Sequence, residues 1–229
     1  MITTILLVTI INSQDMKFNI INSFLFHPRK SYQEMSDKDI LITVEDNIQV
    51  GARFHLIHKS APTLLFFHGN GEIVTDYDDI GTVYNQKNIN FIIADFRGYG
   101  FSNGIPNVEN IQSDAHIILD YVLKHLEEHN YLSSLILMGR SLGSVSVVEL
   151  AKRYPQDFNG LIIESGFADE DPLFKLIGTI DVQTGFKKED GFLNSEKIKK
   201  YTGPLLVIHA KQDHIIPFIQ GDLLYNYCP

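Results

Sequence analysis

Short hydrophobic runs recur along the chain and predict the strands of a sheet. From residue 63 onward these runs are almost continuously apolar and lack the alternation of a strand that has one face in water. Continuous runs of this kind are typical of parallel strands that are covered on both faces. The predicted strands cover residues 41–44, 49–57, 63–69, 90–96, 135–139, 160–165 and 204–210.

Helical periodicity fills intervals between the later strands. The clearest predicted helix covers residues 107–129, where Asn107 can cap the start. Another helix begins after Ser141 and runs to Pro155, whose ring cannot continue a helix. The first helix presents one apolar stripe, made of Ile111, Ala115, Ile118, Leu119, Val122 and Leu126. Its three histidines are therefore expected to face solvent, namely His116, His125 and His129.

The order of these elements predicts the fold class. Strands that alternate with helices indicate right-handed crossovers and an α/β fold, a doubly wound, mostly parallel sheet with helices on both faces. The first two strands, 41–44 and 49–57, are close enough in sequence to form an antiparallel hairpin at the sheet edge. Ligands in such folds bind at the carboxyl ends of the strands, so the candidate chemistry is sought there.

A G-x-S-x-G pentapeptide lies between the strand at 135–139 and the helix that follows it. Gly139 and Gly143 flank Ser141 at the required spacing. Glycines allow strand and helix to approach closely, and the tight turn forces the serine hydroxyl to the top of the sheet. Ser141 is therefore the candidate nucleophile. The alternative is an ordinary strand-to-helix turn with a capping serine.

A glycine-rich loop, HGNGE, follows the first of the apolar strands. Gly69 and Gly71 permit a sharp turn whose N–H groups point inward, and His68 is expected to order that loop. The backbone N–H groups of Asn70 and Leu142 would together form an oxyanion hole. The alternative is a plain glycine turn that closes the strand.

Asp213 follows the strand at 204–210 within the segment HAKQDHIIP. An aspartate in this place can hold a histidine by its ring N–H and stabilise the imidazolium form. The alternative is a turn-forming residue.

Four motifs together resemble those of a known superfamily. HGNGE, ADFRGYGFSNG at 94–104, GRSLG and HAKQDHIIP are similar to motifs of the α/β-hydrolases, and closest to their serine-aminopeptidase and monoglyceride-lipase-like branch. The resemblance covers residues 40–228 and implies a serine hydrolase that cleaves an ester, thioester or amide. It also implies that Arg97 fixes loop structure. A non-catalytic binding or scaffold protein with the same fold is the alternative.

The catalytic histidine is where the chain departs from this resemblance. The family order is serine, acid, histidine, yet the only histidine after Asp213 is its neighbour His214. His68 and His209 lie near strand ends and are expected to serve structure instead. The resemblance therefore implies a chain that lacks the final strand and helix. Such a chain would be nearly inactive and would expose a hydrophobic edge at strand 204–210.

The remaining organisation is simple. Residues 1–20 form an apolar leader, expected to be an extra strand or a disordered segment, with a weak signal or membrane anchor as the alternative. Residues 21–229 form the hydrolase domain, with a short lid over 168–200. Its pocket could be lined by Phe167, Leu173, Phe174 and Ile177. The alternative is that these side chains pack the lid onto the core.

The amino-acid composition limits the classes of partner and cofactor that are expected. The 229 residues include 28 acidic and 19 basic side chains and a formal charge of −9, which argues against nucleic acid and leaves a small-molecule or acyl substrate. Cys228 is the only cysteine, which is compatible with a reducing, cytoplasmic location. A secreted enzyme without disulfides is the alternative. No His/Cys/Asp cluster has ligand spacing, so no metal or cofactor is expected.

Overall fold

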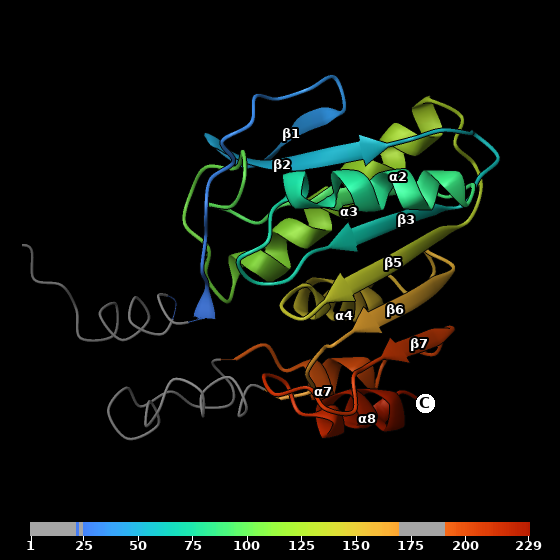
Figure 1. Ribbon diagram of the computed structural model, residues 1–229. Coiled ribbons are helices and arrows are strands. Elements are labelled where there is room, and N and C mark those ends of the chain that lie inside the picture. Colours follow the sequence, from blue (N-terminus) through green and yellow to red (C-terminus); the bar gives the residue numbers. More distant parts are fainter. Residues whose placement is uncertain (1–21, 23–24, 170–190) are drawn as a thin grey trace, which may run out of the picture.

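The computed structural model describes residues 22, 25–169 and 191–229 (Figure 1). The described strands form one seven-stranded sheet in the order β1-β2-β4-β3-β5-β6-β7. They are β1 (Asp39–Glu45), β2 (Ile48–His55), β3 (Thr63–Phe67), β4 (Asn90–Ala94), β5 (Leu135–Arg140), β6 (Gly160–Glu164) and β7 (Leu205–Ile208).

Strand directions match the predicted sheet. β1 pairs with β2 as an antiparallel hairpin, and β2 is antiparallel to β4. The remaining neighbours, from β4 through β3, β5 and β6 to β7, are all parallel. The expected α/β, mostly parallel sheet is therefore confirmed.

Helices cover both faces of this sheet. Leu65 and Phe67 of β3 belong to the large core formed with α3 and α4, whereas Leu64 and Phe66 pack with Tyr77 and other residues on the side of α2. The described helices are the 3-10 turn η1 (Val74–Tyr77), α2 (Asp78–Gln86), α3 (Asn110–Glu128), α4 (Gly143–Arg153), α7 (Asn194–Ile198) and α8 (Phe218–Tyr227). None of the helices in the described part of the chain has the length and apolar character needed to cross a membrane.

The start of α3 follows from its polar residues. Asn107 Oδ1 accepts a hydrogen bond from the Asn110 N–H at 2.7 Å, and Asn110 Oδ1 accepts from the Asn107 N–H at 2.8 Å. This reciprocal pair satisfies N–H groups that the first helical turn leaves without partners. Asn107 therefore caps the Asn110 N–H, although α3 begins at Asn110 and not at residue 107 as predicted.

The expectation that all three histidines of α3 face solvent is wrong for two of them. His116 is half-buried, with Nε2 at 3.5 Å from Glu149 Oε1 on α4. His125 is also half-buried, and its ring centroid is 4.8 Å from that of Phe54. The reason is that α3 packs between α4 and the β1/β2 hairpin, so residues beside its apolar stripe are covered as well. Only His129 is exposed as expected.

A buried ion cluster joins three helices. Glu149 of α4 pairs with His116 of α3 and, at 2.5 Å, with Lys197 of α7. The hydrogen bond from His116, opposed by burial and reinforced by Lys197, lowers the pKa of Glu149 to about 2.

Replacing Glu149 by Gln should destabilise the protein in a pH-dependent way. Because the carboxyl pKa is lower in the folded state, its contribution is present above the unfolded value near 4.5 and is lost as the pH falls toward 2. The shift corresponds to about 3 kcal/mol. Urea unfolding of both proteins at several pH values should show a deficit at pH 7 that closes below pH 4. A deficit independent of pH would contradict the assigned cluster.

Strand β7 forms one edge of the described sheet. It pairs only with β6 among the described strands, and its Leu206 and Ile208 are 52% and 47% exposed. Exposed apolar edge strands are templates for pairing between chains. Within the described residues, the edge at β7 is therefore hydrophobic, as predicted.

Leu206→Lys should reduce self-association of residues 1–229, because a charged residue on an edge strand opposes pairing with another copy. Light scattering against concentration measures the effect. Val83→Lys on α2 is a matched control, since Val83 is 51% exposed and α2 packs on β2 and β4, toward the opposite side of the sheet from β7. An equal reduction by both variants would show that added charge, and not the edge, is responsible.

Candidate active site

Ser141 occupies a strained turn between β5 and α4. Its φ of +50° lies in the left-handed region, which a residue with a side chain rarely adopts. The Ser141 N–H donates to Glu164 O of the neighbouring strand at 2.8 Å, which holds the turn in place. Strain that the surrounding structure maintains in this way is common at functional sites.

The glycines on either side of Ser141 are sterically required. A Cβ at Gly143 would lie 2.0 Å from Phe67 O at the end of β3, and a Cβ at Gly139 would lie 2.4 Å from Gly143 O. No real Cβ approaches backbone oxygen so closely. The G-x-S-x-G spacing therefore lets the first turn of α4 pack directly on the end of β3.

His68 is fully buried at the start of the glycine-rich loop. Its Nδ1 lies 2.8 Å from Gly69 O and its Nε2 lies 3.2 Å from Asp95 Oδ1. The ring also packs edge-on against Phe96, with 4.6 Å between centroids. Both ring nitrogens are engaged away from Ser141, in agreement with a role in ordering the loop.

Asn70 is held by its side chain from outside the loop. Asn70 Oδ1 accepts hydrogen bonds from the Tyr99 hydroxyl at 2.6 Å and the His27 N–H at 2.9 Å, and Nδ2 donates to Leu25 O at 2.9 Å. Gly71 follows with φ of +76°, a conformation that suits glycine. The loop geometry is therefore fixed by residues far away in sequence.

Asp213 lies in the loop after β7. Its Oδ1 accepts hydrogen bonds from the N–H groups of Ile215 and Ile216, both at 2.9 Å. Burial acts to raise the pKa of this carboxyl, but the two N–H donors and the nearby His209 together hold it below its ordinary value. Asp213 is therefore a carboxylate at neutral pH.

A single cavity of about 440 Å³ brings the predicted residues together. Ser141 and Asp213 both line it, with Gly69, Asn70 and Leu142 beside them. Its apolar walls are Leu25, Phe167, Ile215 and Ile216. Among the described residues, no group of three or more His, Cys, Asp or Glu side chains is arranged to hold a metal ion.

A comparison with known families agrees with this geometry. Residues 58–188, more than half of the chain, match the family described as serine aminopeptidase, S33. The chain belongs to the S33 serine aminopeptidase family. This family places it among the α/β-hydrolases, as the four sequence motifs indicated.

Curated relatives of this S33 family member are longer than the chain. It is 33% identical over 197 residues to alpha/beta hydrolase domain-containing protein 17C of Mus musculus, covering 82% of this chain and 56% of that protein. The Homo sapiens protein of the same name matches at 33% identity, with 54% of its length covered. The chain spans about half the length of these relatives.

Solved structures show the same fold at low sequence identity. Est1E from Butyrivibrio proteoclasticus has a TM-score of 0.65 and 17% identity, covering 82% of this chain and 85% of that chain. The Pyrococcus furiosus esterase Pf2001 has a TM-score of 0.66 and 16% identity, covering 88% and 84%. At this level of identity the likeness concerns the fold alone.

Two histidines, His209 and His214, lie near Asp213 in the sequence. The side chain of His209 is buried, and its Nε2 lies 2.8 Å from Ile216 O and 3.7 Å from Asp213 Oδ2. It therefore bonds to backbone, as expected. His214 is exposed and does not line the cavity.

Several residues that line the cavity are not among those predicted from the sequence. Leu25 and His27 come from an amino-terminal segment without helical or strand periodicity, and Glu72 and Arg140 adjoin predicted residues without a motif of their own. Arg97 binds Asp114 and Glu45 and is absent from the cavity wall, in keeping with its expected structural role.

Of the predicted lid over 168–200, residues 170–190 lie outside the described residues, together with Leu173, Phe174 and Ile177. So does the leader, residues 1–20.

Gly143→Ala should destabilise the fold by at least about 2 kcal/mol, since overpacking against backbone cannot be relieved by a rotamer change. Gly71→Ala is a useful comparison, because a Cβ there meets nothing within 4 Å and only the positive φ is unfavourable. That variant should lose about 1 kcal/mol. Urea unfolding measures both, and a Gly143→Ala protein as stable as the parent would contradict the elbow geometry.

Proposed function

We propose that the protein is a serine hydrolase that cleaves a carboxylic ester, thioester or amide through an acyl-serine intermediate. The observation that carries the proposal is the strained Ser141 elbow, which shares one cavity with Asp213 and with both candidate oxyanion residues. Family membership supports a hydrolase, and the apolar cavity walls favour a substrate with an acyl group. Nucleic acid is not proposed as a partner.

The proposed reaction is acyl transfer in two steps. Ser141 Oγ attacks the carbonyl carbon while a base removes its proton, and the N–H groups of Asn70 and Leu142 stabilise the oxyanion that forms. Collapse of this intermediate expels the leaving group, which takes up the proton. Water then attacks the acyl-serine in the same way, which releases the acid and restores the serine.

We propose that the base is a histidine outside the present sequence, held by Asp213. The family order of serine, acid and histidine supports this proposal. A further argument is that His68 and His209 each have a ring nitrogen bonded to a backbone carbonyl oxygen. His27 is the only histidine among the described residues that line the cavity, so it is the competing candidate. Without a base, residues 1–229 should turn over substrate very slowly, since loss of one triad member costs several orders of magnitude.

Labelling with a fluorophosphonate probe tests the proposal. The full-length protein that carries this chain should label at Ser141, Ser141→Ala should not label, and residues 1–229 alone should label far more slowly. His27→Ala should label like the parent in the full-length protein. Loss of labelling in His27→Ala would assign the base to His27. No labelling of any folded form would favour a non-catalytic protein of the same fold.

A further inference from the structure

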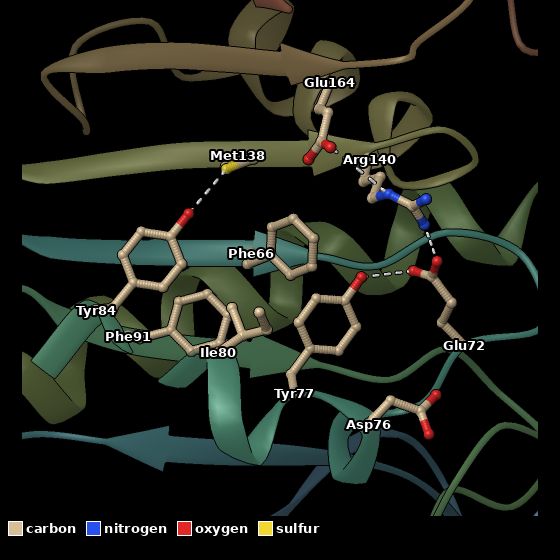
Figure 2. A pocket seen from close by; sticks show the side chains of 10 residues that line it. All are labelled: Phe66, Glu72, Asp76, Tyr77, Ile80, Tyr84, Phe91, Met138, Arg140 and Glu164. Carbon is tan, nitrogen blue, oxygen red and sulfur yellow. Dashed lines mark hydrogen bonds and ion pairs between the residues drawn. The ribbon is translucent and has the colours of Figure 1, made fainter. Parts of the chain in front are cut away.

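Glu72 contacts both segments that carry the proposed oxyanion N–H groups. Its Oε2 accepts a hydrogen bond from the Gly69 N–H at 2.7 Å, one residue before Asn70. Its Oε1 forms an ion pair with Arg140 Nη1, two residues before Leu142 (Figure 2). One carboxylate therefore connects the glycine-rich loop to the serine elbow.

A third donor fixes the direction of this carboxylate. The Tyr77 hydroxyl donates to Glu72 Oε2 at 2.6 Å (Figure 2). Burial, together with the negative charges of Glu164 and Asp76, raises the pKa of the Tyr77 phenol, so that the hydroxyl remains a donor. The side chains of Glu72 and Arg140 are 24% and 38% exposed, so their ion pair is partly open to solvent and the hydrogen bonds from Gly69 and Tyr77 help to hold the carboxylate.

The packing around Gly69 shows how closely the two segments approach. A Cβ at Gly69 would lie 3.0 Å from Glu72 Oε2 and 3.1 Å from Arg140 Nη1. Glycine at this position therefore lets the carboxylate and the guanidinium close over the loop backbone. A side chain at this position would displace both charged groups by a few tenths of an ångström.

We infer that Glu72 is a positioning residue that fixes the separation between the Asn70 and Leu142 N–H groups. The inference rests on the proposed function, because it concerns the oxyanion hole of that reaction. The two N–H groups belong to loops that follow different strands, so their separation depends on whatever ties those loops together. Donors of this kind stabilise the transition state only when they are already aimed at the developing charge.

Loss of Glu72 should therefore affect catalysis more than substrate binding. A displaced donor weakens an interaction that forms only in the transition state, which lowers kcat and leaves KM nearly unchanged. The residue also borders a second cavity of about 580 Å³, lined in part by Phe66, Tyr77 and Met138 (Figure 2). Shorter or neutral side chains at Glu72 thus fit without overpacking.

The test uses the full-length protein that carries this chain and a p-nitrophenyl ester as substrate. Glu72→Gln should lower kcat about 10-fold and Glu72→Ala about 100-fold, with KM within about twofold, by comparison with the loss of one oxyanion donor. Inhibition by benzeneboronic acid, which forms a tetrahedral adduct on serine, should weaken in step with kcat. Glu72→Ala/Arg140→Gln should be little slower than Glu72→Ala alone, since without Glu72 the Arg140 side chain keeps only its longer contact with Glu164, at 3.8 Å.

Glu45→Gln is the matched control, because it removes another Glu–Arg ion pair, with Arg97, outside the cavity. It should change neither constant. Unchanged kcat in Glu72→Ala, or an equal change in kcat and KM, would overturn the positioning role while Ser141 labelling leaves the proposed function standing. A parent protein that neither labels at Ser141 nor cleaves the ester would overturn the proposed function and this inference with it.

Discussion

The backbone contact between Gly143 and Phe67 is the constraint on which the rest of the site depends. A Cβ at Gly143 would come within 2.0 Å of Phe67 O, so the first turn of α4 rests directly on the end of β3. This approach leaves Ser141 in a left-handed turn with φ of +50°. Because Phe67 directly precedes His68, the same contact brings the glycine-rich loop beside the serine elbow. The candidate nucleophile and the proposed oxyanion donors thus share one geometric origin.

The parallel sheet supplies the other parts of the site. The loops after β3, β5 and β7 all leave the sheet at the carboxyl-terminal ends of the strands (Figure 1). They carry Asn70, Ser141 and Asp213, respectively. Each loop is fixed by contacts other than the sheet itself. Tyr99 and His27 hold the first, Glu164 O holds the second, and two N–H groups hold Asp213. A rigid sheet with separately tied loops is a suitable support for transition-state stabilisation.

Fold and motif residues could be predicted because their signals are local. Apolar runs identified every described strand, although the run at 63–69 extends past the end of β3 at Phe67. The features that could not be predicted depend on contacts between segments that are distant in the sequence. His27 meets Asn70 across 43 residues, and the burial of His116 depends on its approach to Glu149. Neither contact is indicated by a hydrophobic periodicity in the sequence. The Glu72–Arg140 pair was missed for the same reason.

The most direct test of the account is a crystal structure of the full-length protein after reaction with a fluorophosphonate. We expect phosphorus bonded to Ser141 Oγ, with the phosphoryl oxygen within about 3 Å of both the Asn70 and Leu142 backbone nitrogens. That arrangement would show the strained serine and the two N–H groups acting on one tetrahedral centre. An adduct on another residue, or a phosphoryl oxygen turned away from those N–H groups, would contradict it.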